Sequence, residues 1–257
     1  MKLKTNDIKK LLDQKVLEFS NQAYINSDPI QIPHQYSAIP NIEISAFLTA
    51  QLAWGNRKAI IKSAGALMSL MENNPHEWIL NGEKRDFETL NKFVYRTFNA
   101  TDLQFYVLQL QNILKKHSSL GAYFQHLYTN ANGNIKEMLG NFHLQFMQDA
   151  PQRSRKHLAN VNKGSAAKRL NMFLRWMVRS DQKEIDFGLW DFIPQSQLYI
   201  PLDVHSGRVA RKLGLLERKV DDWKSVEILT DKLREFDAED PIKYDFALFG
   251  LGVFEKF

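Results

Sequence analysis

Apolar side chains recur at intervals of three and four residues through most of the chain, the spacing of helices with one buried face. The pattern predicts helices over 5–20, 42–52, 57–71, 87–96, 101–116, 120–129, 135–148, 165–178, 204–213, 222–236 and 241–249. No run alternates strictly between apolar and polar residues, and Val94–Tyr95 and Leu198–Ile200 are too short to form a sheet of their own. We therefore predict an all-α fold.

Breaks in this pattern coincide with proline, glycine and asparagine. A connector with several prolines runs over 26–40, and Trp54–Asn56 separates two of the predicted helices. Another helix ends at 72–75, and 130–134 is a loop. Asp240 and the proline after it have the order of an N-cap and a first helical residue.

The composition excludes several classes of site. The chain has 257 residues, of which 44% are hydrophobic, enough for a full core. It has no cysteine, which excludes disulfides, thiolate zinc sites, cysteine-ligated iron–sulfur clusters and a cysteine nucleophile. Charged residues interrupt 1–10, unlike a signal peptide, and no apolar run approaches the roughly 20 residues of a membrane span. We expect a soluble, cytoplasmic protein without membrane association.

The net charge of +5 is unevenly distributed. Residues 153–180 contain eight Lys or Arg and no acid, whereas 217–257 contain eleven acids and seven bases. A basic block of this kind predicts a surface for a polyanion, most often nucleic acid. Charge alone fits an ordinary solvated helix face equally well.

The segment Tyr199–Gly214 contains the first candidate site. Asp203 occupies the N-cap position of the helix predicted over 204–213, near the positive end of the helix dipole and beside His205. Gly214 takes the position after the last helical turn. A basic edge formed by Arg208, Arg211 and Lys212 faces away from the apolar stripe of this helix. The simple alternative is a capped core helix.

The segment Gly164–Arg179 contains the second candidate site. Gly164 and Ser165 could offer free backbone N–H groups to a phosphate at the start of the helix. Lys168 lies one turn inside this helix start. Spacings of seven and four place Arg175 and Arg179 on the same side as Lys168, away from the buried stripe Leu170, Phe173, Leu174 and Met177. A desolvated lysine among cations is a candidate nucleophilic amine, although most lysines are solvent-exposed bystanders.

Three segments resemble, in the same order, motifs of the DNA glycosylases of the endonuclease III and 8-oxoguanine glycosylase superfamily. The segment over 164–174 is similar to their helix-hairpin-helix pattern Gly-x-Gly-x-Lys-x-x-Asn-x-x-Leu, with the lysine at Lys168. The segment over 201–214 is similar to their Pro-Val-Asp-Thr-His-Val-x-Arg-Val-x-x-Arg-Leu-Gly motif, with the aspartate at Asp203. The segment over 47–53 resembles their Leu-Leu-Ser-x-Gln-x-x motif.

The chain departs from this family pattern in two places. Ala166 replaces the second glycine of the hairpin, and a rival register beginning at Leu158 would put Gly164 where the lysine belongs. The register with Lys168 also matches the asparagine and leucine of the pattern. Lys168 and Asp203 are 35 positions apart, a long spacing that is most similar to that of the archaeal 8-oxoguanine glycosylases. The extra segment runs over 180–198.

The resemblance implies a two-lobed helix-hairpin-helix fold, with one helical lobe over 41–195 and a second formed by 1–40 and 196–257. It implies a base-excision DNA glycosylase that flips an oxidised purine such as 8-oxoguanine out of duplex DNA. The family's roles fall on Lys168, which would attack C1′ of the sugar and add AP lyase activity, and on Asp203 as the catalytic carboxylate. No cofactor, no metal and a monomeric state are expected.

The same resemblance gives the remaining site residues. The expected DNA contacts are Gln51, Gly164, Ser165, Arg175, Arg179 and Arg208, although the arginines could equally be structural. The candidates for the base pocket are Trp54, Trp190 and His205, for each of which packing or an orienting hydrogen bond is the simpler alternative.

Three other functions stay open from the sequence alone. A non-catalytic nucleic-acid-binding protein on the same scaffold would bind DNA with a steep salt dependence and release no product. A helical protein–protein adaptor would not bind DNA. A metallohydrolase built on Asp203 and His205 lacks further ligands in the sequence.

Overall fold

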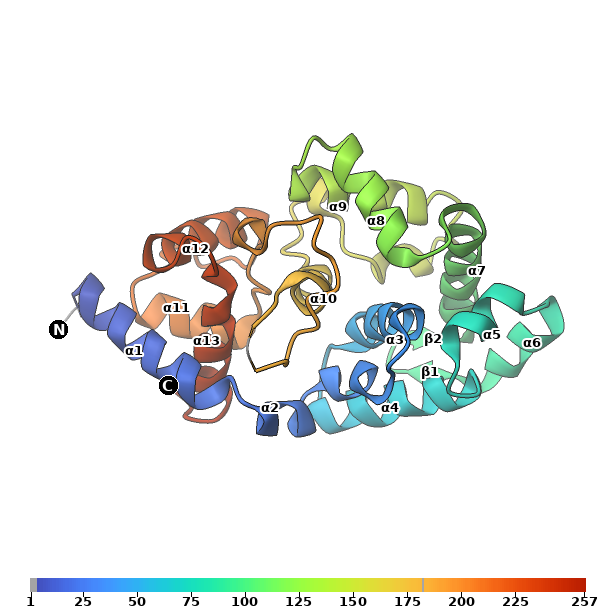
Figure 1. Cartoon of the computed structure of the whole chain (residues 1–257), viewed down its shortest axis with the longest axis horizontal. Coiled ribbons are helices and arrows are strands. Elements are labelled where there is room, and N and C mark those ends of the chain that lie inside the picture. The colour runs from blue at the N-terminus through green and yellow to red at the C-terminus, as the bar shows by residue number, and fades with distance from the viewer. Residues whose placement is uncertain (1–3, 182) are drawn as a thin grey trace. The chain divides into compact units, whose positions relative to one another are not determined.

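A computed structural model describes residues 4–181 and 183–257, and its regular structure is almost entirely helical (Figure 1). This confirms the all-α class. The described strands are β1 (Val94–Tyr95) and β2 (Phe98–Asn99), which pair antiparallel with Tyr95 opposite Phe98. Among the described residues, no helix combines the length and the apolar character needed to cross a membrane.

The chain divides into two compact units, each with its own core. The first is built from both ends of the chain, 1–26 and 160–257, and the second is the continuous segment 27–159. The predicted lobes were divided at 40/41 and 195/196, whereas these units are divided at 26/27 and 159/160. The observed division puts Lys168 in the same unit as Asp203.

The unit over 27–159 has an aromatic core. The ring of Phe47 lies 5.8 Å from that of Phe142, and the ring of Tyr106 lies 5.0 Å from that of Phe146. All four side chains are buried. The helices around them are η1 (Pro29–Gln31), η2 (Pro33–Gln35), α3 (Ile39–Leu52), α4 (Arg57–Leu70), α5 (Pro75–Asn81), α6 (Lys84–Glu88), η3 (Thr89–Lys92), α7 (Ala100–His117), α8 (Leu120–Asn130), α9 (Ile135–Phe146) and η4 (Ser154–Lys156).

The unit formed by the two chain ends is built around α13 (Tyr244–Val253), whose residues are buried on nearly all sides. Two helices pack along it, α1 (Thr5–Phe19) and α11 (Val204–Lys212) (Figure 1). The remaining helices are α2 (Gln22–Ser27), which reaches the unit boundary, η5 (Val161–Lys163), α10 (Lys168–Val178), η6 (Gln195–Gln197), α12 (Trp223–Phe236) and η7 (Pro241–Lys243).

The predicted helices agree in outline with those of the structure, but α2 was not predicted, α10 begins at Lys168 and not at residue 165, and residues 75–99 differ. The helix predicted over 87–96 is wrong, because this stretch contains the end of α6, the turn η3 and strand β1. Helix α5 was not predicted, although Pro75 is its first residue and buries its ring. Phe87, Leu90 and Phe93 have the spacing of one helix face and are all buried in the structure. The periodicity of apolar residues alone therefore could not distinguish the predicted helix from the turn and strand that form.

Candidate active site

Helix α10 begins at Lys168, whose side chain is half-buried. The residue before it, Ala167, has a left-handed backbone with φ of 48°, which marks an abrupt start to the helix. The predicted stripe Leu170, Phe173, Leu174 and Met177 is buried, as expected. The rest of the helix from Leu170 to Val178 is buried as well, so α10 has no broad solvent face on which to display cations.

Asp203 is the N-cap of α11, as predicted. Its Oδ1 atom accepts hydrogen bonds from the backbone N–H groups of His205, at 2.8 Å, and Ser206, at 3.0 Å. The Ser206 hydroxyl accepts a return bond from the Asp203 N–H at 3.0 Å, which completes a capping box. Gly214, with φ of 74°, follows the helix in the left-handed conformation that was expected there. The carboxylate is thus held in one orientation.

A third charged residue, Asp245 in the first turn of α13, connects the two candidates. Its carboxylate is buried and forms an ion pair with the Arg175 guanidinium of α10. Burial raises the pKa of the Asp245 carboxyl to about 6, a rise that Arg175 opposes, Asp203 strengthens and Lys168 opposes. Since the charges of both Asp203 and Lys168 act on this one carboxyl, the structure brings the two predicted residues into one electrostatic neighbourhood.

Arg175 and Arg179 belong to a buried ion network. Arg175 contacts Asp186 at 3.2 Å as well as Asp245, and it lies over the ring of Phe246. Arg179 contacts Asp181 at 2.6 Å, Asp186 at 3.0 Å and Asp240 at 2.9 Å. Although burial by itself lowers the pKa of Arg179, the Asp186 and Asp240 carboxylates raise it above its usual range.

This network overturns one prediction. Arg175 and Arg179 are 2% and 3% exposed, so neither guanidinium is available to a DNA phosphate. The expected DNA contacts at these two positions are wrong, and the structural alternative holds. Sequence reasoning missed the partners Asp186, Asp240 and Asp245, because acids near helix ends are common and nothing local distinguishes these three.

The backbone at Gly164 and Ser165 is also occupied. The Gly164 N–H donates to the carbonyl of Val161 at 3.0 Å, and the Ser165 N–H donates to that of Asn160 at 3.1 Å. The Gly164 carbonyl in turn accepts from the N–H of Trp223 at 2.9 Å. The expectation of free N–H groups for a phosphate at these two residues is therefore wrong. Gly164 instead ends η5 in a left-handed turn.

The exposed side of α11 carries two further candidates. His205 is exposed, which contradicts the alternative of packing in the core, and its ring lies 6.4 Å from that of Phe249. Arg208 is exposed, but one nitrogen of its guanidinium, Nη2, donates a hydrogen bond to the carbonyl of Gly252 at 2.8 Å. This bond holds the end of α13 against α11. A DNA contact at Arg208 and a base-pocket role for His205 stay predictions.

The aromatic and glutamine candidates are mostly interior. Gln51 and Trp190 are each 2% exposed, which contradicts a DNA contact at Gln51 and a stacking surface at Trp190. Trp190 packs with its ring 5.3 Å from that of Phe173. Trp54 is half-buried, with the Arg96 guanidinium over its ring at 4.8 Å and Tyr95 edge-on at 5.8 Å. Packing therefore accounts for both tryptophans.

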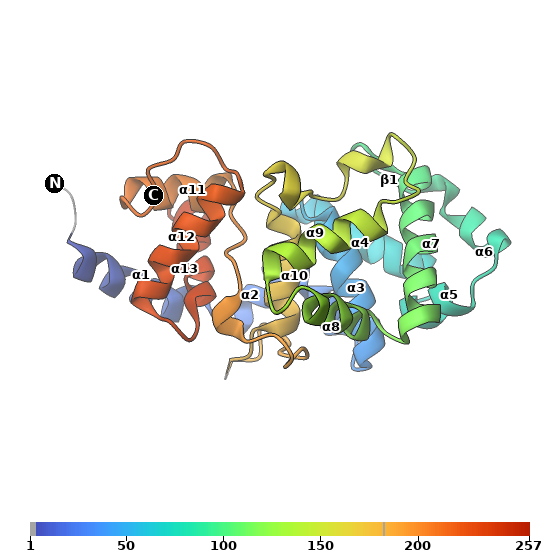
Figure 2. The same ribbon diagram turned by 90° about the horizontal axis from the view of Figure 1, so that it is seen from above.

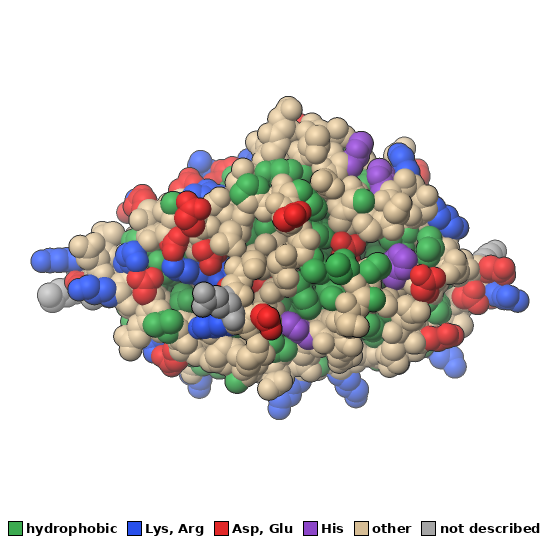
Figure 3. Space-filling view, viewed as in Figure 1, with side chains coloured by type: hydrophobic (Ala, Val, Ile, Leu, Met, Phe, Trp, Pro, Cys, Tyr) green, Lys and Arg blue, Asp and Glu red, His purple; other side chains and the backbone are tan. Residues whose placement is uncertain are grey.

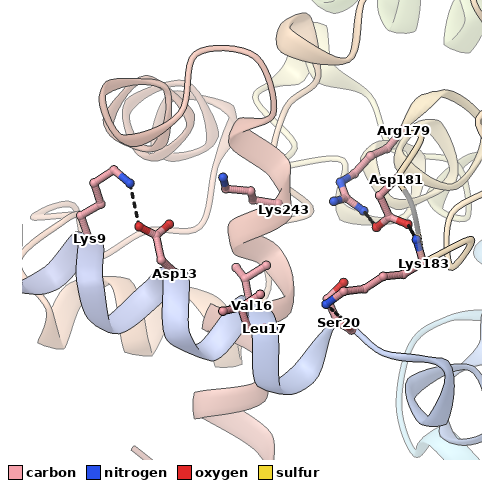
Figure 4. A pocket seen from close by; sticks show the side chains of 9 residues that line it. All are labelled: Lys9, Asp13, Val16, Leu17, Ser20, Arg179, Asp181, Lys183 and Lys243. Atoms are coloured by element: carbon pink, nitrogen blue, oxygen red, sulfur yellow. Dashed lines mark hydrogen bonds and ion pairs between the residues drawn. The ribbon is translucent and has the colours of Figure 1, made fainter.

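The unit of the two chain ends also contains a cavity of about 500 Å³ (Figure 4). Asp13, Val16 and Leu17 of α1 line one side of it, and Arg179 and Asp181 line the other. Neither Lys168 nor Asp203 lines it, so it is separate from the candidate active site. In the part of the chain that the structure describes, no group of three or more His, Asp or Glu side chains is arranged to hold a metal ion.

Comparison with known proteins gives a family but no activity. A family model described as a protein of unknown function, DUF2400, matches residues 28–254. No curated protein and no solved structure matches the chain.

Proposed function

The chain belongs to the DUF2400 family, whose description names no activity, and we propose that it is a DNA base-excision glycosylase acting on an oxidised purine in duplex DNA. The observation that carries the proposal is that Lys168 and Asp203, 35 positions apart in sequence, both lie close enough to the buried carboxyl of Asp245 to shift its pKa, which Asp203 raises and Lys168 lowers. A lysine and a fixed carboxylate in one neighbourhood are the two groups that a lysine-dependent glycosylase needs. The resemblance described above supplies the choice of reaction and of substrate.

Lys168 is the proposed nucleophile. Its neutral amine would form a bond from Nζ to C1′, while the electron pair of the glycosidic bond leaves with the base, which takes up a proton. The attached nitrogen then carries two protons and a positive charge. Transfer of one of these protons to the ring oxygen, as the bond from C1′ to that oxygen opens, would give a protonated Schiff base.

Asp203 is the proposed stabiliser of positive charge. As the glycosidic bond breaks, the sugar becomes cationic, and a carboxylate fixed beforehand stabilises that charge without reorganising. The two backbone bonds to Oδ1 fix this carboxylate, and they leave Oδ2 without a backbone donor among the described hydrogen bonds. The same residue is suited to assist loss of the lysine proton.

The experiment that tests the proposal is borohydride trapping on duplexes that contain 8-oxoguanine or an abasic site. We expect a covalent adduct with the unmodified protein and none with Lys168→Gln. Lys163→Gln is the matched control, since Lys163 is an exposed lysine five positions away on the turn that precedes α10. An adduct that survives in Lys168→Gln but is lost in Lys163→Gln would contradict the assignment. Salt-dependent binding without an adduct on either duplex would favour the non-catalytic alternative.

A further inference from the structure

The unit over 27–159 carries an exposed basic platform, which we define as Arg96, Arg153, Arg155 and Lys156. These residues come from two segments that are distant in sequence, the tip of the β1–β2 hairpin and the turn η4. The segments over 89–101 and 150–180 contain no Asp or Glu. In Figure 2 the chain after α9 runs beside β1, and the Arg153 Nη2 donates to the carbonyl of Thr97 at 3.2 Å.

Arg96 is held in place by the turn between α3 and α4. Its guanidinium lies over the Trp54 ring at 4.8 Å, and the Tyr95 hydroxyl donates to the Trp54 carbonyl at 2.6 Å. Gly55 has φ of 103°, and a Cβ atom there would lie 2.5 Å from Arg96 Nη1. The glycine therefore leaves room for the guanidinium. The turn between α3 and α4 contains no acidic residue. It supports Arg96 but is not counted as part of the platform.

The other half of the platform is anchored by a buried acid. Asp102 is fully buried, accepts from the Ser154 hydroxyl at 2.7 Å, and contacts Arg153 at 3.0 Å. The Arg155 Nε donates to the carbonyl of Ala150 at 3.3 Å. These bonds fix the turn η4, so that Arg155 and Lys156 project from an ordered backbone into solvent. A rigid arrangement of cations loses little conformational entropy when it binds an anion.

The charge of the platform is not cancelled at the surface. Among the described residues, Arg96, Arg155 and Lys156 form no ion pair with a carboxylate, and the only acid paired with Arg153 is the buried Asp102. The face drawn in Figure 3 differs, because acidic and basic side chains are intermixed on it. Several guanidinium and ammonium groups of one sign, held on neighbouring turns, suit an anion with regularly repeated charges.

We propose that this basic platform binds the phosphate backbone of duplex DNA, with Arg155 and Lys156 among its exposed contacts. The identity of the polyanion as DNA rests on the proposed function, whereas the platform itself rests on the contacts above. Phosphate contacts of this kind position a protein on the duplex and carry no sequence information. The platform is therefore expected to strengthen binding to damaged and undamaged duplexes alike.

The test compares two double variants that remove equal charge from the same unit. Arg155→Ala/Lys156→Ala removes two exposed cations of the platform, and Lys115→Ala/Lys116→Ala removes two adjacent exposed cations from the last turn of α7. Arg153 is left intact, because its loss would leave the buried Asp102 charge less well compensated. Fluorescence anisotropy on an undamaged duplex between about 50 and 200 mM salt measures affinity without turnover.

We expect the Arg155/Lys156 variant to bind about tenfold more weakly or worse, and its plot of log affinity against log salt to become shallower by about 2. The Lys115/Lys116 variant should bind like the unmodified protein. Equal affinities and equal salt slopes for the two variants would overturn the platform, and an acidic protein would then be the better partner for these residues.

The same proteins separate this inference from the proposed function. Single-turnover excision of 8-oxoguanine, measured over a range of protein concentrations, should need about tenfold more of the Arg155/Lys156 variant to reach half of its maximal rate, because the platform contributes affinity. Excision by the unmodified protein with no effect of the variant on binding would overturn the platform and leave the glycosylase standing. If the Arg155/Lys156 variant alone loses affinity, and neither it nor the unmodified protein excises the base, the platform is supported and the proposed glycosylase activity is contradicted.

Discussion

Asp203 combines a structural and a proposed chemical role, and two substitutions separate them. Asparagine keeps a side-chain oxygen that can accept from the N–H groups of His205 and Ser206, but it removes the negative charge. We expect Asp203→Asn to unfold at the same denaturant concentration as the unmodified protein and to excise the base roughly 100-fold more slowly or worse. Asp203→Ala should lose the cap as well, at a cost of about 1 kcal/mol in the free energy of unfolding. Full single-turnover activity in Asp203→Asn would show that the reaction does not need the negative charge of Asp203.

Asp245 gives a prediction for the dependence of stability on pH. Its pKa rises from 3.8 in the unfolded chain to about 6 in the folded protein. Between these values the folded state keeps the proton that the unfolded chain has lost, so the free energy of unfolding falls as pH rises from about 4 to about 6. The carboxyl is buried, so this contribution is worth roughly 3 kcal/mol across the window.

Asp245→Asn isolates this contribution. The free energy of unfolding of the unmodified protein, minus that of the variant, should fall by roughly this 3 kcal/mol between pH 4 and 7 and stay level above it. Urea titrations at a series of pH values measure both terms. Asp186, whose pKa burial also raises, shares the Arg175 guanidinium with Asp245, so the difference reports the coupled titration of the two carboxyls. A difference independent of pH would contradict the assigned shift.

These residues also mark what the sequence could predict. The cap at Asp203 was predictable, because a cap depends on residues within one helical turn and on its position before a periodic segment. The environment of Arg175 was not, since its partners Asp186 and Asp245 lie 11 and 70 positions away. A cation spaced with Lys168 on one helix face looks the same in sequence whether that face meets solvent or buried carboxylates.

At the scale of elements, the packing of α1 on α13 can be tested at a glycine. A Cβ atom added at Gly250 of α13 would overlap the ring of Phe19 in α1, so the ring or one of the two helices would have to move. We expect Gly250→Ala to lower the free energy of unfolding by about 1–3 kcal/mol. Gly65→Ala in α4 is the matched control, because its nearest neighbour would be an Ile32 methyl at 3.9 Å. That variant should gain about 0.5–1 kcal/mol from helix propensity. Equal denaturation midpoints for the two variants would contradict the close packing.

Long periodic helices were predictable, and short elements were not. Helices such as α7 and α12 combine several turns of apolar periodicity with an Asn or Asp cap, so that two independent signals agree. The stretch that includes Val94 and Tyr95 has buried residues at intervals that fit a helix, but it pairs with Phe98 and Asn99 as a hairpin. The platform residue Arg96 lies at the tip of this hairpin, so an error in secondary structure also concealed a candidate binding surface.

At the scale of the whole molecule, the division into units leads to a prediction about fragments. The unit over 27–159 is one continuous segment with its own aromatic core, whereas the other unit needs both ends of the chain. Ile8 and Leu12 of α1 are buried, and Phe19 of the same helix lies against Gly250 of α13. Without α1, a fragment over 160–257 would expose the apolar face of α13 to water, which is unfavourable by about 25 cal/mol for each Å² exposed.

We therefore expect the fragment over 27–159 to melt cooperatively by circular dichroism on its own. The fragment over 160–257 should be poorly ordered alone and should gain helix when a peptide of residues 1–26 is added. A peptide in which Ile8 and Leu12 are replaced by serine is the control, since it keeps the charge of α1 and loses its buried side chains. A stable, cooperative fold of 160–257 alone would contradict the prediction, because α13 would then be covered by α11 and its other neighbours without α1. If the peptide restores order, Lys168, Asp203 and Asp245 can be studied in a unit assembled from two separate pieces. The trapping experiment can then be carried out with and without the segment over 27–159.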